Sequence, residues 1–300
     1  MGISHYIKEI GRGKQGARAL AREQAADLFG QVLDGTVTDL EIGAFCLAMR
    51  IKGETAQEMG GFLDATYARL DRIPAGTKPL VVIPSYNGAR KLPVLTPLLA
   101  LLVARRGLPV LVHGTATETA RVFVPEVLAP LGVQTLSKAQ AIEPGQVAYA
   151  PTELLHPGLK RLLDVRRVVG LRNPAHSLVK LMNPSAGEAV VVSSYTHPEY
   201  AVSMGEVFEL MRSTALLLRG TEGEAVADAR RLPQMEGFVR GQRMLLEAGQ
   251  KGTLTSLPDL PPDVSPEGTA AYIRQVLDGT KPVPASIAQQ VEHILLLGAS

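Results

Sequence analysis

The chain has 300 residues, of which 46% carry hydrophobic side chains and 20% are charged, with a formal net charge of +2. A chain of this length and composition can bury a sizeable core without metals or disulfides, which excludes a small stapled scaffold, a collagen-like chain and an intrinsically disordered one. The single cysteine, Cys46, excludes an intramolecular disulfide, no apolar run reaches the roughly 18 residues of a membrane span, and charged residues occupy the N-terminus where a signal peptide would need an apolar core. We therefore expect a cytoplasmic protein with no membrane partner.

The first seventy residues have the pattern of helices separated by short turns. Apolar residues recur near the 3.6-residue period from Leu20 to Val32 and stop before Gly35. Two further helices are expected to begin at a threonine that is followed three residues later by a glutamate, which is the spacing of a capping box. The first of these helices directs Cys46 into the core. The two pairs are Thr38 with Glu41 and Thr55 with Glu58.

The pattern changes near Pro74 to short β-rich runs, and residues 75–300 are expected to form an α/β domain after a helical domain of residues 1–74. The runs 80–83 and 108–112 read as buried strands, and the apolar stretch 95–106 between them reads as a helix. A strand, a helix and a strand in this order make a right-handed crossover, which requires a parallel sheet. Further strands are expected at 134–136, 148–150 and 189–192, further helices at 117–131 and 202–218, and a proline-rich loop at 257–266.

Charge is unevenly distributed along the chain. Residues 78–181 hold 13 Lys and Arg against 5 Asp and Glu, a net charge of +8 that the near-neutral total conceals. The densest run is 156–180, where Asp164 is the only acidic residue. Basic and apolar residues alternate along 159–167, so one side of a helix can pack while the other presents cations to several phosphates. The opposing interpretation is an ordinary solvated helix face.

Polar residues also follow the first two expected strands, at the edge where α/β proteins bind ligands. The turn after the first strand, 84–91, has one glycine and ends in Arg90 and Lys91, so it indicates anion contact through side chains more than a glycine-rich phosphate cradle. An Asn-Gly turn with ordinary surface cations explains it equally well. His113 follows the second strand and by itself is a weak signal.

Several motifs resemble the anthranilate phosphoribosyltransferase family, a branch of the glycosyl transferase family three superfamily. They are Lys52-Gly53-Glu54-Thr55, Val112-His113-Gly114, Ala150-Pro151 to His156-Pro157, Val165-Arg166-Arg167 to Gly170, and Leu181-Met182-Asn183-Pro184. The resemblance covers nearly the whole chain. It implies a nucleoside phosphorylase/phosphoribosyltransferase-like fold, with a small helical domain, a larger α/β domain with a mainly parallel sheet, a segment near 158–185 that returns to complete the helical domain, and homodimers formed through the helical part.

The chain departs from that family where the family binds its phosphoribosyl donor. The family's Gly-Thr-Gly-Gly-Asp loop is replaced by Ser85-Tyr86-Asn87-Gly88-Ala89, and its metal-binding Asp-Glu pair by Pro198-Glu199. Residues that resemble the family's aromatic-acid contacts remain, so the resemblance implies a residual small-ligand pocket at Asn87, His113, His156 and Arg166. The motifs at 84–90, 197–200 and 219–224 resemble a nucleic-acid-binding branch of the superfamily that is implied to lack transferase activity.

These observations predict a non-catalytic protein that binds DNA or RNA, largely without regard to sequence, along a basic groove, with no catalytic residue, metal site or cofactor. The alternative is a phosphoribosyltransferase that acts on an anthranilate-like acceptor through an altered donor loop. A third interpretation treats the cations as solubilising surface only. The candidate phosphate contacts are Arg90, Lys91, Arg105, Arg106, Lys160, Arg161, Arg166, Arg167, Arg172 and Lys180.

Overall fold

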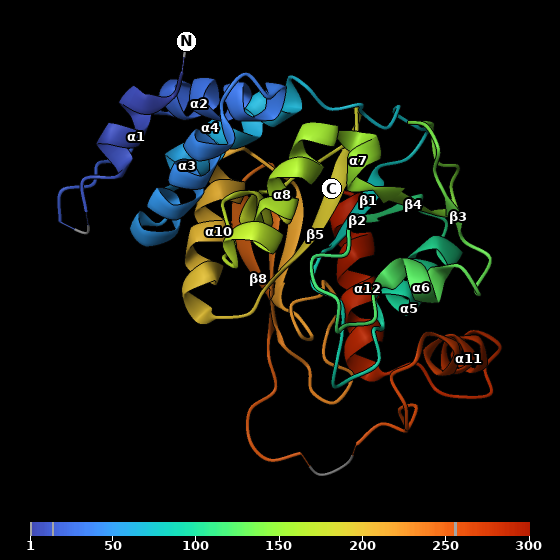
Figure 1. The fold of residues 1–300 in the computed structure, drawn as a ribbon. Coiled ribbons are helices and arrows are strands. Elements are labelled where there is room, and N and C mark those ends of the chain that lie inside the picture. The colour runs from blue at the N-terminus through green and yellow to red at the C-terminus, as the bar shows by residue number, and fades with distance from the viewer. Residues whose placement is uncertain (1, 14, 255–256) are drawn as a thin grey trace.

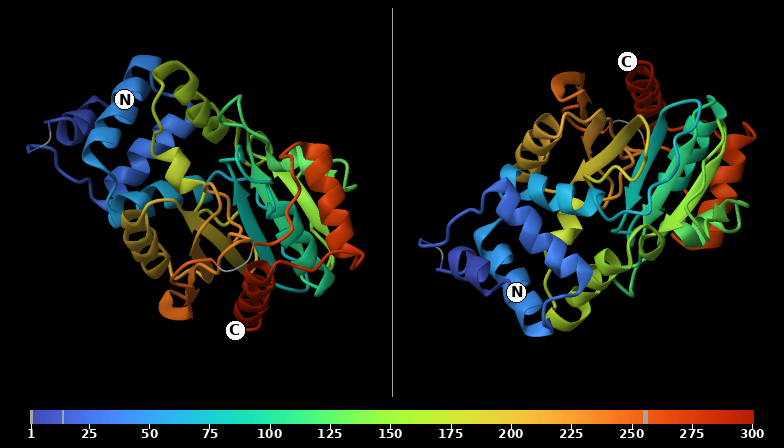
Figure 2. Two further views of the ribbon diagram at one scale, coloured as in Figure 1. Left: turned by 90° about the horizontal axis from the view of Figure 1, so that it is seen from below. Right: turned by 90° about the horizontal axis from the view of Figure 1, so that it is seen from above.

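Four helices from the N-terminal part of the chain form a bundle at one side of the molecule (Figures 1 and 2). The computed structural model describes residues 2–13, 15–254 and 257–300. The bundle core contains three mutually packed phenylalanines, with the rings of Phe29 and Phe62 stacked at 4.7 Å and Phe45 edge-on to both. The four helices are α1 (Ser4–Ile10), α2 (Arg22–Asp34), α3 (Asp39–Lys52) and α4 (Ala56–Tyr67).

The predicted capping boxes are confirmed at the starts of α3 and α4. The Thr38 side chain accepts from the Glu41 amide, the Thr55 side chain accepts from the Glu58 amide, and each glutamate accepts in return from the threonine amide. Cys46 lies on the inner side of α3 and is 3% exposed. Burial raises the pKa of its thiol to about 12, so Cys46 is a core residue.

The α/β part is built on one eight-stranded sheet whose order is β3-β4-β2-β1-β5-β6-β7-β8. The first six strands in this order pair in parallel, and β7 and β8 form an antiparallel hairpin at one edge. The strands are β1 (Leu80–Ser85), β2 (Val110–Gly114), β3 (Gln134–Thr135), β4 (Val147–Pro151), β5 (Ala189–Tyr195), β6 (Ala215–Arg219), β7 (Gln234–Val239) and β8 (Gln242–Ala248).

Both faces of the sheet are covered, which explains why its central strands are apolar without interruption. Val81 and Ile83 point into the core under α5 (Thr96–Arg105) and α12 (Ala285–Gly298). Val82 points into the other core, which continues into the helical bundle past α10 (Pro198–Leu210). The bundle and one face of the sheet therefore share one apolar core. The remaining helices of the α/β part are α6 (Val124–Leu128), α7 (Thr152–Leu155), which packs on β4, and α11 (Pro266–Leu277), which packs on α5 and α6.

A later segment of the chain returns to the bundle. Helix α8 (Pro157–Val169) packs on α2, and α9 (Ala175–Leu178) packs on α4. Arg161 of α8 donates to the carbonyl of Val32 at 2.9 Å, so this arginine ties the returning segment to the bundle. Figure 2 shows α8, in yellow-green, beside the blue helices.

Two predicted helices differ from the structure. The prediction of a helix over 117–131 is wrong for its first half, because Pro125 occupies the first turn of α6 and helix cannot continue well through the residues before a proline. The prediction over 202–218 merges α10 with strand β6. A run of leucines at 216–218 fits a buried helix and a buried strand equally well, and here it lies in the middle of the sheet.

Among the described residues, no helix is both long and apolar enough to span a bilayer.

Candidate functional site

The turn between β1 and α5 is filled by two carboxylates from the segment after β6. Glu224 is buried and accepts from the main-chain N–H groups of Asn87 at 2.9 Å and Gly88 at 2.8 Å. The hydroxyls of Ser85 and Thr96 donate to its other oxygen, at 2.6 and 3.2 Å. Convergent N–H groups before a helix are a common way to bind phosphate, and here they bind a side chain of the same molecule.

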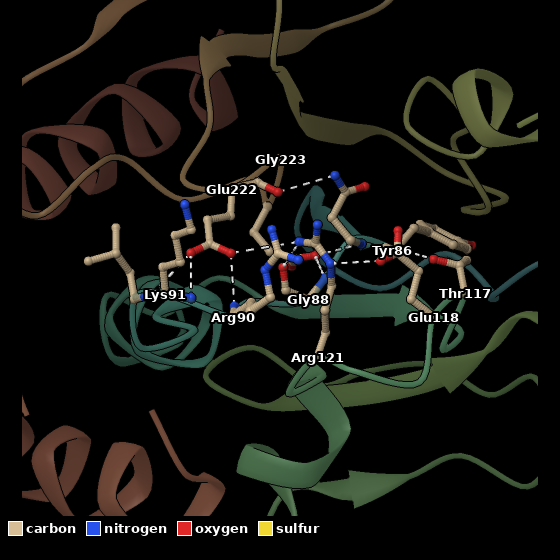
Figure 3. Close-up of polar contacts among 12 residues, drawn as sticks. Tyr86, Gly88, Arg90, Lys91, Thr117, Glu118, Arg121, Glu222 and Gly223 are labelled. Atoms are coloured by element: carbon tan, nitrogen blue, oxygen red, sulfur yellow. Dashed lines mark hydrogen bonds and ion pairs between the residues drawn. The ribbon is translucent and has the colours of Figure 1, made fainter. Parts of the chain in front are cut away.

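Glu222 completes this arrangement on the outer part of the turn (Figure 3). Its carboxylate accepts from the main-chain N–H groups of Arg90 and Lys91 at 2.8 Å each and of Leu92 at 3.1 Å. Glu222 has a φ of +53°, in the left-handed region that costs free energy for a residue with a side chain. The three N–H donors hold the residue in that conformation. The anion bound by the N–H groups of this turn is therefore a carboxylate of the same chain.

Ion pairs extend from Glu222 across the same edge of the sheet. Arg121 lies between two carboxylates, 3.1 Å from Glu118 and 3.7 Å from Glu222, as Figure 3 shows. Glu118 also pairs with Arg166 at 2.7 Å and Arg172 at 3.8 Å. Burial alone would raise the pKa of Glu118, but the hydrogen bonds from Arg166 and Arg121 lower it below its ordinary value, so it stays ionised.

The structure thus brings seven of the ten predicted cations to one edge of the sheet, with Arg121 as an eighth. Asp164 pairs with both Lys160 and Arg167. Arg167 also donates to the carbonyl of Ala116, two residues before Glu118, so both cations are linked to the network around Glu118. Lys180 donates to the carbonyl of Gly223 at 2.9 Å. These eight side chains, which we call the basic band, lie with the four carboxylates of Glu118, Asp164, Glu222 and Glu224. The basic band comprises Arg90, Lys91, Arg121, Lys160, Arg166, Arg167, Arg172 and Lys180.

Three of the predicted cations lie elsewhere. Arg161 points to the helical bundle, as described above. Arg105 and Arg106 end α5, just before β2, and so lie at the opposite edge of the parallel sheet. Arg105 donates to the carbonyl of Leu277, and Arg106 pairs with Glu292.

The four residues of the predicted small-ligand pocket do not surround one cavity. His113 is fully buried, its Nδ1 is 2.9 Å from the hydroxyl of Tyr86, and burial lowers its pKa to about 3, so the ring is neutral. Asn87 donates to the carbonyl of Glu222. His156 caps the start of α8 by accepting from the Leu159 amide, whereas Arg166 lies near the other end of that helix. Ten residues of helix separate them by about 15 Å.

A cavity of about 470 Å³ lies instead between α3, α4, α10 and the end of β5. Arg172, His176 and Lys180 line it on one side, and Arg50 and Glu54 on the other. Burial lowers the pKa of Lys180 to about 8 and that of His176 to about 3, while it raises the pKa of Glu54. Lys180 therefore keeps most of its positive charge at pH 7, and together with Arg50 and Arg172 it makes the cavity cationic.

Several nitrogen atoms in this region have no hydrogen-bond partner among the described residues. They are His113 Nε2, Arg166 Nη1 and His176 Nε2, and all three are buried. A buried donor without a partner is costly, so this side of the molecule has hydrogen-bonding capacity to spare for a ligand or for water.

Sequence reasoning did not assign a role to three of the four carboxylates in the network. Glu118 and Arg121 lie in a segment predicted as helix, and Glu222 and Glu224 enter the sequence analysis only as part of a family-like motif. A usable signal was present in Glu222-Gly223-Glu224, because two acids that flank a glycine directly after a strand can reach the neighbouring turn. Within residues 2–13, 15–254 and 257–300, no set of three or more His, Cys, Asp or Glu side chains is grouped to hold a metal ion.

Comparison with known proteins finds similarity over nearly the whole length of the chain. Residues 4–69 match the helical bundle domain of a glycosyl transferase family. The chain is 42% identical over 304 residues to YbiB of Escherichia coli strain K12, an alignment that covers 99% of the chain and 94% of YbiB. It is 26% identical to the anthranilate phosphoribosyltransferase of Methylobacterium nodulans, over 92% of the chain and 82% of that protein.

Solved structures show the same fold. The anthranilate phosphoribosyltransferase of Thermus thermophilus superposes with a TM-score of 0.72 at 21% identity, over 97% of this chain and 87% of that one. The enzyme from Saccharomyces cerevisiae in complex with PRPP and Mg superposes with a TM-score of 0.70 at 13% identity, over 99% and 88% of the two chains.

Proposed function

The chain belongs with YbiB in the anthranilate phosphoribosyltransferase superfamily, glycosyl transferase family 3, and we propose that it binds nucleic acid through the basic band without catalysing phosphoribosyl transfer. The basic band carries the proposal because eight cationic side chains, contributed by four separate segments, meet at one edge of the sheet. Four carboxylates offset only half of their charge. A surplus of clustered positive charge attracts a polyanion.

The exposed parts of the basic band are suited to a nucleic-acid backbone. The side chains of Arg90 and Lys91 are exposed and form no ion pair within the described residues, and the Arg167 side chain is 58% exposed. Val168 and Leu171 are also exposed, at 89% and 41%, beside Arg167 and Arg172. An apolar patch with a cationic rim is typical of an interaction surface. Because the exposed groups are cations that contact phosphates and carry no base-specific information, we expect binding to be largely independent of sequence.

The two internal glutamates argue against phosphoribosyl transfer. A diphosphate leaving group needs N–H donors or a metal to stabilise its developing charge. In this chain the N–H groups of the β1–α5 turn already donate to Glu222 and Glu224, and a diphosphate at that position would also meet two negative charges. This feature favours binding over the alternative, an active transferase.

A salt titration of binding to short single- and double-stranded oligonucleotides tests the proposal. We expect the logarithm of the affinity to fall linearly with the logarithm of the salt concentration. Each phosphate contact should contribute about −0.7 to the slope on single strands and about −0.9 on duplex. Five or more contacts would give a slope of about −3.5 or steeper on single strands. The slope counts the phosphates, and the comparison of the two substrates ranks single strand against duplex.

Two results would contradict this function. Affinity that is insensitive to salt would mean that the basic band does not contact phosphates. Turnover of phosphoribosyl pyrophosphate with Mg²⁺ and anthranilate, measured as release of diphosphate, would establish the alternative function.

A second copy of this chain is the partner that we propose for the helical bundle. Leu40, Leu47 and Ile51 of α3 are 84%, 46% and 61% exposed and lie on one side of that helix, at spacings of seven and four residues. A two-fold dimer through such a face buries the same residues on both copies and places two basic bands in one particle.

Dimer formation through α3 predicts a specific change in oligomeric state. Replacing Leu47 and Ile51 by glutamate is expected to halve the mass measured by light scattering, because four charges would be desolvated in the interface. Leu296→Glu on α12, where the side chain is 58% exposed, provides the control and should leave the mass unchanged. A wild-type mass equal to one chain would refute the dimer.

A further inference from the structure

A second cavity lies at the opposite edge of the parallel sheet, away from the basic band. It has a volume of about 280 Å³ and is bounded by the starts of β5 and β6 and the end of α12. Three exposed arginines line it, Arg72, Arg212 and Arg240, with Glu188 as the one acidic side chain in its wall. None of the three arginines forms an ion pair within the part of the chain that the structure describes.

Arg212 occupies a position where an arginine is unfavourable. It follows the end of α10 with a φ of +52°, its amide donates to the carbonyl of Glu209, and the Ser213 amide donates to that of Phe208. These bonds form a Schellman motif, in which the left-handed residue is usually glycine because a side chain there costs free energy.

Arg240 occupies a second position of the same kind. Arg240 and Gly241 form the two-residue turn between β7 and β8, and both have a positive φ, of +49° and +82°. Such turns strongly favour asparagine or glycine at the first position. The Gly241 amide donates to the carbonyl of Ser213 at 2.9 Å, and this bond places the turn directly beside Arg212.

Two residues with an unfavourable positive φ therefore line the same cavity. Arg212 and Arg240 are two of the three non-glycine residues with positive φ among the described residues, and the third is Glu222 in contact with the β1–α5 turn. Backbone strain that persists in a fold is a guide to function when the strained side chains share a site. Both arginines line one cavity, and a third guanidinium lies in the same wall.

We propose that Arg72, Arg212 and Arg240 form a binding site for a phosphate group, separate from the basic band. A guanidinium can donate two parallel hydrogen bonds to a phosphate, and the three guanidinium groups, offset by Glu188, leave a net side-chain charge that matches a phosphate dianion. Ser213 and Thr214, which also line the cavity, supply hydroxyl groups for further hydrogen bonds. The phosphate belongs either to a small monoester or to a nucleic-acid backbone, since the chemistry of recognition is the same.

A purely structural role for these arginines makes the opposite prediction about stability. Cations near the C-terminal end of a helix stabilise it through the helix dipole, and Arg212 directly follows Met211, the C-cap of α10. If that were the reason for the arginines, replacing them would destabilise the protein. If the arginines serve to bind a ligand, replacing them by a residue better suited to positive φ should stabilise the protein.

The test uses the double variants Arg212→Gly/Arg240→Gly and Arg212→Asn/Arg240→Asn in the full chain. The melting temperature is measured in inorganic phosphate and in potassium chloride at equal ionic strength, and phosphate affinity is measured by calorimetry. We expect both variants to melt higher than wild type without phosphate, and to bind phosphate at least about tenfold more weakly. Arg105→Gln/Arg106→Gln, which removes two charges at the same edge of the sheet, should bind phosphate as wild type does.

An oligonucleotide arm identifies the source of the phosphate. Unchanged oligonucleotide affinity in the glycine variant, with weakened phosphate binding, assigns the site to a small phosphate monoester. A parallel loss of both affinities assigns it to a nucleic-acid backbone. Phosphate binding equal to wild type in both double variants, or lower melting temperatures in both, overturns the proposal. Neither of these two results depends on the basic band, so failure of the phosphate site would not contradict the proposed nucleic-acid binding.

Discussion

Glu58→Ala is expected to cost about 3–5 kcal/mol of unfolding free energy, the loss typical of breaking a buried ion pair. Glu58 is fully buried and accepts from the ammonium of Lys52 at 2.6 Å, from the Thr55 amide at 2.9 Å and from the Leu20 amide at 2.9 Å. The alanine variant leaves the largely buried side chain of Lys52 and two main-chain donors without their partner. Urea unfolding followed by circular dichroism measures the loss.

Glu41→Ala is the matched control for that measurement. Glu41 occupies the same position of the same motif at the start of α3, with a threonine three residues before it, but it has no lysine partner and is more exposed. We expect a much smaller loss of stability from it. Equal losses for the two variants would show that the Lys52–Glu58 pair adds nothing to the capping box.

Charge reversal of the basic band is expected to weaken nucleic-acid binding about 100-fold in the double variant Arg167→Glu/Arg172→Glu. A hydrogen bond to a charged group contributes about 1.5 kcal/mol or more, which is roughly tenfold in affinity per residue. The salt dependence should also become shallower, by about 0.7–0.9 for each phosphate that the variant no longer binds. Fluorescence anisotropy with a labelled oligonucleotide, repeated at several salt concentrations, measures both changes.

Arg105→Glu/Arg106→Glu changes the net charge of the protein by the same amount and serves as the control. These two arginines lie at the far edge of the sheet, where they contact Leu277 and Glu292. If binding depends on the basic band, this variant keeps nearly the wild-type affinity at moderate salt. Equal losses in the two double variants would mean that only total charge matters, which is the behaviour of a merely solubilising surface.

The elements governed by local rules could be predicted from the sequence. The capping boxes at Thr38 and Thr55, the stop at Gly35 and the first β-α-β unit depend on residues that are close in the chain, and they are confirmed. The helix predicted over 202–218 failed because the choice between helix and strand at 216–218 depends on the neighbouring strands. The β7–β8 hairpin was not predicted, because its Arg240-Gly241 turn lacks the usual Asn-Gly or Asp-Gly signal.

The site was less accessible to sequence reasoning than the fold. The surplus of cations in 78–181 is visible in the sequence, but their directions depend on partners far along the chain. Arg161 and Arg166 lie on one helix, and yet one contacts the bundle and the other contacts Glu118. Glu222 and Glu224 reach the β1–α5 turn from more than 120 residues away, a pairing that no local spacing rule predicts.

The carboxylates in the β1–α5 turn also set a condition for any redesign of this edge of the sheet. A glycine-rich loop engineered into 85–91 would still meet Glu222 and Glu224, and removal of those two glutamates alone would leave the main-chain donors of the turn without their acceptors. The two segments therefore depend on each other, and changing either one alone leaves carboxylates or main-chain donors without a hydrogen-bond partner. A design that aims to place a diphosphate in this turn must change both segments at once.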